Sequence, residues 1–349
     1  MISLIFSPLL PRYRNSICPR YGFLAASSPR ASQARRFVTS LTERHSAMAV
    51  AAIRAYGRTM NAEHIVVRGE HVTLAVSPEG AEPQSLLDGD GHEYLWQAGP
   101  EWPRHATVLF PIICRVPDDT ITVRGQHYPM SQHGFARNRT FDVVDADQSR
   151  VSFVLAADDE TRERFPYDFA LAVTYEAQDL SVSITYDVEN RGDVPMPFSL
   201  GFHPAFAWPL EPDARRTLHE VRFDEPEHGP YRRVVDNLLT DEEYPSLVGE
   251  DRRIGLTDTL FEDGAVIMPS VVSNGLTYLA STGRGVRIEW EGFTGVTLWT
   301  KPGADFLCLE AWRGLPAPHD FAGDFLDKPG NAIVPVGERL QFSYRITLL

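Results

Sequence analysis

The chain has 349 residues, of which 43% are hydrophobic, so it is long enough to bury a substantial core. It contains no apolar run near the roughly 18 residues that a membrane span requires. Its formal net charge of −14 argues against binding to nucleic acid or to an anionic membrane. Its three cysteines, Cys18, Cys114 and Cys308, are far apart and match neither a disulfide framework nor a zinc site. This use of cysteine fits a reducing compartment, and we expect a cytoplasmic protein.

Residues 1–59 differ from the rest of the chain because they contain nine arginines and a single acid, Glu43. The remaining residues carry 24 basic and 46 acidic side chains, a net charge of −22. An acid-poor leader rich in Arg and Ser is typical of an organellar transit peptide. The other interpretations are an upstream extension ahead of a true start at Met48 or Met60, and a functional tail. In each case we expect residues 60–349 to form one domain.

From about residue 62 onward the pattern is typical of β-structure. Residues 180–188, 286–290 and 340–348 alternate apolar and polar side chains, as expected for strands with one face in a core. Further strands are predicted at 121–123, 151–155, 171–175 and 296–299, with turns at 88–91, 190–193 and 301–303. Residues 211–255, which are richer in Pro, Arg, Asp and Glu, predict long loops over the sheet.

No segment has the period of a long capped helix, and no Gly-x-Gly-x-x-Gly motif follows a strand. Both absences argue against a dinucleotide-binding fold. Many antiparallel strands joined by short turns predict an all-β protein, a large antiparallel β-sandwich or barrel.

Two polar residues in the first half of the chain are candidates for binding a ligand. Arg115 ends the apolar run 110–114, so it is either a charge at a strand end or a fixed donor for sugar hydroxyls. His133 precedes Gly134, which permits unusual backbone angles and the close approach of a ligand. The alternative for His133 is a turn histidine with no chemical role.

The second half holds the candidates for acid/base chemistry. His203 lies among aromatic residues and precedes Pro204, which restricts its backbone to extended conformations. Histidine can give and take protons near neutral pH, although a core histidine bonded to a carbonyl group is the alternative. Glu310 interrupts an apolar run, and burial would raise its pKa toward that of a general base. The alternative for Glu310 is the solvent face of a strand.

Other classes of site find less support. The histidines lack metal-ligand spacing, so no metal is expected, and no Gly-x-Ser-x-Gly motif indicates a serine hydrolase. Several aromatic residues are candidates either to stack on the apolar face of a sugar or to pack in the core: Phe202, Phe206, Trp208, Trp299 and Trp312.

Taken in order, the motifs resemble those of the aldose 1-epimerase (galactose mutarotase) family, in particular its LacX-like bacterial branch. The resemblance covers about residues 62–349. The motifs that carry it are Trp102-Pro103-Arg104, Leu109-Phe110-Pro111-Ile112 leading to Arg115, Gln132-His133-Gly134-Phe135-Ala136-Arg137, Gly201-Phe202-His203-Pro204-Ala205-Phe206, Leu298-Trp299-Thr300-Lys301-Pro302-Gly303-Ala304 and Cys308-Leu309-Glu310-Ala311-Trp312.

The resemblance implies a galactose mutarotase-like β-supersandwich with a sugar cleft on one sheet. It also implies ring opening by acid/base catalysis on a free hexose, with Glu310 as the base and His203 as the acid. His133 and Arg115 would hold the ring and its hydroxyls. The implied partner is a small-molecule sugar, with no cofactor, and we expect a monomer or a homodimer.

The chain departs from the family pattern at two positions next to the motif residues. Cys114 stands before Arg115, where the family usually has glycine, and Ala311 follows Glu310, where it usually has proline. Members outside the branch contact the sugar through an aspartate. Asp258 is the candidate here, with a helix or loop cap as the alternative.

Three other functions remain open on the sequence alone. A hexose-6-phosphate 1-epimerase would use Arg137 and Arg139 to bind phosphate, although the acidic body would not attract an anionic sugar. A carbohydrate-binding protein without turnover would need no acid/base pair. A glycoside hydrolase would need two catalytic carboxylates, and no second matching motif is visible.

Overall fold

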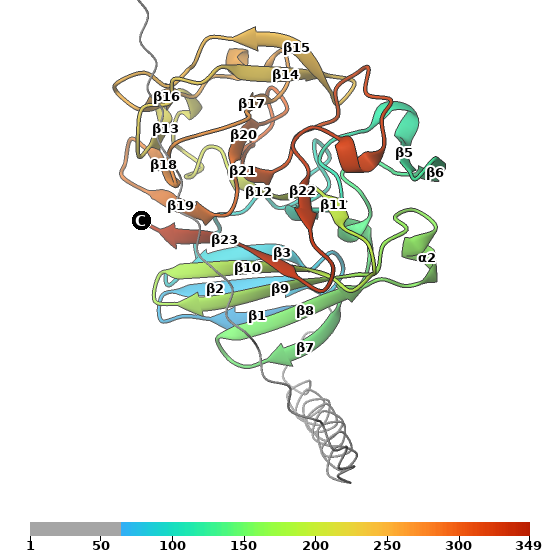
Figure 1. Ribbon diagram of the computed structural model, residues 1–349. Coiled ribbons are helices and arrows are strands. Elements are labelled where there is room, and N and C mark those ends of the chain that lie inside the picture. The colour runs from blue at the N-terminus through green and yellow to red at the C-terminus, as the bar shows by residue number, and fades with distance from the viewer. Residues whose placement is uncertain (1–63) are drawn as a thin grey trace, which may run out of the picture. The chain divides into compact units, whose positions relative to one another are not determined.

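The computed structural model describes residues 64–349, which belong to one compact unit (Figure 1). The prediction for residues 1–59 lies outside the described residues. The larger of two main sheets has nine strands, in the order β16 (Arg253–Gly255), β13 (His219–Phe223), β18 (Gly275–Ala280), β19 (Gly285–Glu291), β23 (Arg339–Leu348), β10 (Ser181–Asn190), β9 (Phe169–Gln178), β8 (Arg150–Ala156) and β7 (Asp142–Ala146).

The second main sheet has seven strands and carries the candidate site. Its order is β15 (Leu238–Tyr244), β14 (Tyr231–Val235), β17 (Val266–Met268), β20 (Gly295–Trp299), β21 (Phe306–Arg313), β12 (Leu200–Ala207) and β4 (Ala106–Leu109). The strand pairs of both sheets are antiparallel. The predicted all-β sandwich is therefore confirmed.

Three small sheets complete the strand set. They consist of β1 (Ile65–Arg68), β2 (Val72–Ser77) and β3 (Glu82–Asp88); β11 (Met196–Phe198) and β22 (Ala332–Val334); and β5 (Thr120–Val123) and β6 (Gln126–Pro129). The helical segments are single turns, namely α2 (Asp159–Arg162) and the 3₁₀ turns η1 (Pro117–Asp119), η2 (Ala136–Asn138), η3 (Arg216–Leu218), η4 (Asp258–Phe261) and η5 (Phe325–Asp327). Within residues 64–349, none of these helices has the length and hydropathy needed to cross a membrane.

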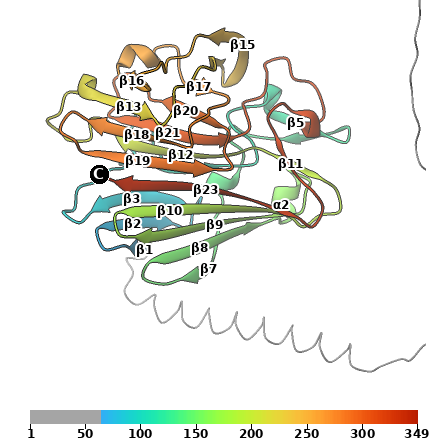
Figure 2. The ribbon, with the colours of Figure 1, turned by 60° about the vertical axis from the view of Figure 1, so that its left-hand side comes forward.

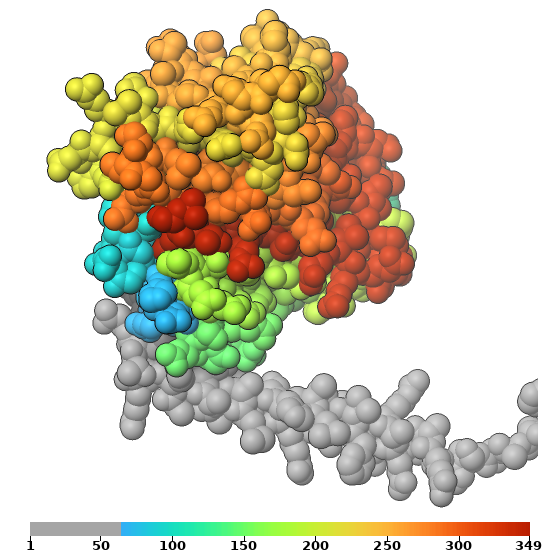
Figure 3. Space-filling model, turned by 90° about the vertical axis from the view of Figure 1, so that its left-hand side faces the viewer, coloured from blue at the N-terminus to red at the C-terminus, as the bar shows by residue number. Residues whose placement is uncertain are grey.

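The clearest alternating segments of the sequence form neighbouring strands. Residues 340–348, 286–290 and 180–188 lie in β23, β19 and β10, and β23 pairs with both of the others. Figure 2 shows these strands side by side near the middle of the larger sheet. On the surface shown in Figure 3, β23 appears as a red band between the orange residues of β19 and the green residues of β10.

The prediction of long loops at 211–255 is wrong, because this segment contains β13, β14, β15 and β16. Two of them, β15 and β16, are edge strands of the two main sheets. Edge strands commonly carry charged side chains, which discourage pairing with another chain. β15 contains Asp241, Glu242 and Glu243, and these exposed charges hide the alternation that identifies a strand.

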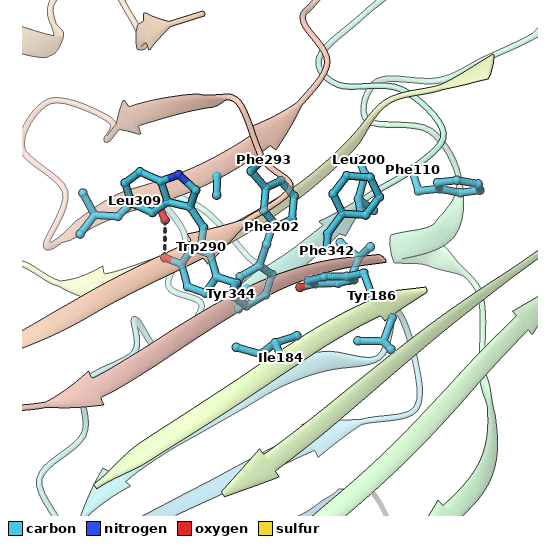
Figure 4. Packing of buried hydrophobic residues seen from close by; sticks show 14 of the residues in the cluster. Phe110, Ile184, Tyr186, Leu200, Phe202, Trp290, Phe293, Leu309, Phe342 and Tyr344 are labelled. Atoms are coloured by element: carbon cyan, nitrogen blue, oxygen red, sulfur yellow. Dashed lines mark hydrogen bonds between the residues drawn. The ribbon is translucent and has the colours of Figure 1, made fainter. Parts of the chain in front are cut away.

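The main core lies between the larger sheet on one side and the seven-stranded sheet together with β1–β3 on the other. In β12, Phe202 points toward the larger sheet, and its ring contacts Tyr344 of β23 edge to face at 5.0 Å (Figure 4). The Tyr344 hydroxyl crosses the layer to donate a 2.8 Å hydrogen bond to the carbonyl oxygen of Leu309 in β21. Because side chains alternate along a strand, the residues between these core positions face the opposite side of the seven-stranded sheet.

Loop residue Lys328, at the end of η5, is almost fully buried. Its ammonium group donates to the carbonyl oxygen of Leu315 at 2.6 Å and to Asn331 Oδ1 at 3.2 Å. These bonds hold together the loop between β21 and β22.

The stability of the protein is expected to depend on pH through Lys328. Burial lowers the pKa of its ammonium group to about 7, whereas an unfolded lysine titrates near 10.4. Between about pH 7 and 10 the unfolded chain therefore binds the extra proton, and the free energy of unfolding rises with pH by about 1.4 kcal/mol per unit from this residue. Urea unfolding at pH 7 and pH 9 should show this rise in the wild type and not in Lys328→Met. An identical rise in both proteins would show that Lys328 stays charged when folded.

Candidate active site

The far face of the seven-stranded sheet brings His203 and Glu310 together. Strands β12 and β21 pair through Gly201 with Trp312 and through Ala205 with Cys308, on either side of the two residues. His203 Nε2 lies 3.4 Å from Glu310 Oε1, and the two side chains are 8% and 1% exposed. Two residues that lie 107 positions apart in the sequence thus form a buried acid/base pair.

Burial favours the uncharged form of each partner. It raises the pKa of Glu310 well above its usual range, opposed in part by the hydrogen bond that Trp312 Nε1 donates to Oε2 at 2.9 Å. Burial and the positive charge of Arg137 lower the pKa of His203 to about 3. Moving the carboxyl proton to the imidazole gives a carboxylate and an imidazolium with no change in net charge. The pair can therefore exchange a proton without drawing one from solvent.

His133 is held beside this pair by an unusual turn. Its φ is +63° and that of Gly134 is +73°, so the turn brings Gly134 against Phe110. The Cys114 N–H donates to His133 Nδ1 at 3.0 Å, so the neutral ring carries its proton on Nε2. The His133 ring lies perpendicular to that of His203, with 5.7 Å between centroids. Burial and the charge of Arg137 lower the pKa of His133 and keep it neutral.

Aromatic side chains enclose the other side of His203. The Trp102 ring stacks on the His203 ring at 4.9 Å, and Trp299 approaches it edge to face at 5.7 Å. Trp96 Nε1 donates to the carbonyl oxygen of Trp102 at 2.8 Å, which fixes the loop that carries Trp102. These rings exclude water from the pair and thereby maintain its shifted pKa values.

The five aromatic residues that were candidates for stacking divide into two groups. Phe202, Phe206 and Trp208 belong to the main core, whereas Trp299 and Trp312 lie on the side of the sheet that carries the pair. The interpretation of core packing is therefore confirmed for the first three. The sequence reasoning missed the contact of Trp102 with His203, although Trp102 opened one of the motifs.

The predicted binding arginines have different surroundings. Arg137 donates to the carbonyl oxygen of Gln132 at 2.8 Å, and burial and the nearby Arg104 lower its pKa to about 10. It is a fixed positive charge next to the two histidines. Arg115 forms an ion pair with Asp119, in which its Nε donates to Oδ1 at 2.8 Å, and its side chain is 41% exposed. Its role in holding the sugar remains a prediction.

The remaining candidates have ion-pair partners of their own. Asp258, in η4, accepts hydrogen bonds from Arg216 Nη2 at 2.7 Å and from the Gly303 N–H at 3.0 Å. This is the arrangement of a loop cap, and a sugar contact for Asp258 remains a prediction. Arg139 forms ion pairs with Asp158 and Glu160.

One cluster among the described residues has potential metal ligands close together. Ligand atoms of His203, Cys308 and Glu310 lie within 4.8 Å of one another. Burial raises the pKa values of the Cys308 thiol and the Glu310 carboxyl well above their usual ranges. A metal needs the deprotonated forms of both groups, so this donor set suits proton transfer better than metal binding.

Comparison with known proteins identifies the family of the chain. The family model described as aldose 1-epimerase matches residues 63–347. Protein LacX of Lactococcus lactis subsp. lactis, in its plasmid and chromosomal forms, is 29% identical over 296 residues, which cover 82% of this chain and 99% of LacX.

Solved structures show the same relationship. A galactose mutarotase-like protein from Lactobacillus casei ATCC 334 is 30% identical with a TM-score of 0.77, over 82% of this chain and 100% of that one. A galactose mutarotase related enzyme from Lactobacillus acidophilus is 28% identical with a TM-score of 0.77, over 82% of this chain and 97% of that one. The predicted family and LacX-like branch are confirmed, and the chain belongs to the aldose 1-epimerase family.

Proposed function

We propose that the protein is an aldose 1-epimerase that interconverts the α and β anomers of a free hexose. Membership of the family supports an isomerase acting on carbohydrates. The observation that carries the finer proposal is the contact of 3.4 Å between His203 Nε2 and Glu310 Oε1, in a pair whose side chains are both buried. Anomer exchange requires a base for the anomeric hydroxyl and an acid for the ring oxygen, and this pair supplies both.

Ring opening starts from the carboxylate and imidazolium form of the pair. Glu310 takes the proton from the anomeric hydroxyl, the electron pair of that O–H bond forms the C1 carbonyl, and the bond from C1 to the ring oxygen breaks. His203 gives its proton to the departing ring oxygen. Rotation about C1–C2 and closure with the roles reversed yield the other anomer. Each positioned group of this kind contributes about 10²–10⁴ in rate.

The surroundings of the arginines support a neutral sugar over a sugar phosphate. The phosphate alternative depended on Arg137 and Arg139 acting together. Arg139 is engaged with two carboxylates, those of Asp158 and Glu160. Of these two arginines, Arg137 is the one near the pair, and its contact with the carbonyl oxygen of Gln132 limits its reach.

The burial of both His203 and Glu310 supports turnover over a purely carbohydrate-binding role. Binding a neutral sugar requires hydrogen-bond donors and acceptors, and ordinary polar side chains supply these at lower cost than a buried carboxyl beside a buried imidazole. Burial raises the pKa of Glu310 and lowers that of His203, and pKa values perturbed in this way are typical of catalytic groups.

Polarimetry tests the proposal directly. Fresh α-D-glucose and α-D-galactose should approach their equilibrium rotation faster with the protein than without it, whereas α-D-glucose 6-phosphate should be accelerated less. Faster exchange of the phosphate than of either free hexose would identify a sugar-phosphate epimerase instead. No acceleration of any of the three sugars would exclude turnover of these substrates and leave a binding role.

A further inference from the structure

Two threonines extend the acid/base pair into a polar row across the sheet. Thr297 of β20 lies opposite Glu310 of β21, and Thr107 of β4 lies opposite His203 of β12. These four strands are adjacent in the sheet, and β20, β21 and β12 lie together in Figures 1 and 2. Since neighbouring strands are about 4.8 Å apart, the row spans roughly 14 Å. Its order is Thr297, Glu310, His203, Thr107.

The hydroxyl groups of both threonines are buried without a partner. The two residues are 1% and 0% exposed, and within residues 64–349 neither Oγ1 atom has a hydrogen-bond partner. Buried hydroxyls are nearly always hydrogen-bonded, and valine would suit a strand equally well at no such cost. His203 Nδ1 and Arg137 Nε are also buried without partners. Unsatisfied polar atoms therefore gather around the pair.

Apolar side chains border the row on both sides, so its polar atoms form a stripe one residue wide. The neighbouring positions on one side are Leu109, Gly201 and Trp312, and on the other Ala205, Cys308 and Trp299. A threonine hydroxyl can donate one hydrogen bond and accept others, which matches the donor and acceptor capacity of a sugar hydroxyl. The stripe therefore suits a ligand with several hydroxyls in line and apolar C–H surfaces above and below.

We infer that Thr107 and Thr297 bind sugar hydroxyls on either side of the anomeric centre and determine which sugars are accepted. The inference rests on the proposed function, in which Glu310 acts at the anomeric oxygen and His203 at the ring oxygen. In a hexopyranose, C2 adjoins the anomeric carbon and C5, which bears the C6 hydroxymethyl group, adjoins the ring oxygen. The order of the row therefore pairs Thr297 with the 2-hydroxyl and Thr107 with the 6-hydroxyl.

The test combines each threonine variant with the sugar that lacks its hydroxyl. With α-D-glucose, Thr297→Val and Thr107→Val should each raise KM about threefold to tenfold at nearly constant kcat, because a hydrogen bond made equally in ground and transition states is lost. Thr297→Val should not raise KM for 2-deoxy-D-glucose, and Thr107→Val should not raise it for 6-deoxy-D-glucose. Thr297→Val should still raise KM for 6-deoxy-D-glucose, and Thr107→Val should still raise it for 2-deoxy-D-glucose. Thr297→Ser should restore the wild-type KM.

Thermal unfolding distinguishes this binding role from a structural role, because the two roles predict opposite changes in the Tm of the valine variants. Because valine removes an unsatisfied buried hydroxyl, each variant should unfold at the same or a higher temperature than the wild type. A lower Tm together with an unchanged KM would overturn the inference and give the threonines a structural role. Equal effects on the parent and deoxy sugars would also overturn it. A wild type that accelerates none of these sugars would instead refute the proposed function, and the inference with it.

Discussion

Glu310→Gln is expected to lower kcat for α-D-glucose by about 10²–10⁴ while leaving the fold intact. The amide has nearly the shape of the carboxyl group and can still accept the hydrogen bond from Trp312 Nε1. It cannot take a proton from the anomeric hydroxyl. Because burial already favours the uncharged carboxyl in the free protein, the neutral amide should cost little stability. Polarimetry for kcat and urea unfolding for stability measure the two effects separately.

Glu227→Gln is the matched control, because Glu227 is also a buried glutamate. Its carboxylate oxygens accept hydrogen bonds from the Val272 and Ser273 N–H groups, both at 2.8 Å. Replacing one oxygen by an NH₂ group leaves one of these donors without its acceptor, so this variant should lose about 1–3 kcal/mol of stability and keep its kcat. Glu310→Gln should instead lose kcat and keep its stability. Normal turnover by Glu310→Gln would show that another group is the base.

The strands that alternate most clearly in the sequence have one buried face and one face that is more exposed. β10, β19 and β23 lie at the middle of the larger sheet and alternate clearly. The alternation disappears in two situations. Edge strands such as β15 carry consecutive charged residues, which interrupt the alternation. Both faces of β12 and β21 are buried, so their sequences are nearly continuous apolar runs.

The candidate site was predictable where residue type is unusual for its surroundings. A histidine and a glutamate within apolar runs attract notice, and the motifs around His203 and Glu310 indicated them both. Thr107 and Thr297 gave no such signal, because threonine is common in strands. Their importance depends on register across four strands and on the absence of a partner among the described residues. A linear sequence contains neither kind of information.

The proposed mechanism needs few groups, because in it His203 and Glu310 share one proton. A neutral sugar exchanges anomers without net gain or loss of protons, and the pair of His203 and Glu310 likewise keeps a constant proton count. In the proposed mechanism, ring opening and closure use each residue once as an acid and once as a base. The aromatic enclosure formed by Trp102 and Trp299 therefore has one main task, to keep water from competing for the proton.

Gly134→Ala is expected to destabilise the fold far more than the addition of a single methyl group usually does. A Cβ atom at Gly134 would lie 2.1 Å from the carbonyl oxygen of Phe110 and 2.4 Å from its carbon, and φ is +73°. Both obstacles are backbone atoms, so no side-chain rotation relieves the overlap. The loss should exceed about 4 kcal/mol of unfolding free energy, the range of exceptional single substitutions. Urea unfolding measures it as a lower midpoint at constant slope.

Gly337→Ala separates the two causes of that loss. Gly337 has a φ of +72°, and a Cβ atom there would meet nothing within 4 Å. This variant should lose only the roughly 1–2 kcal/mol of the left-handed conformation, so the difference between the variants measures the contact with Phe110. Any Gly134→Ala protein that folds must move the turn that carries His133 away from Phe110, and so should bind sugar more weakly because His133 is displaced. Equal stability losses in the two variants would mean that the turn has room to relax, and that the position of His133 does not depend on Gly134.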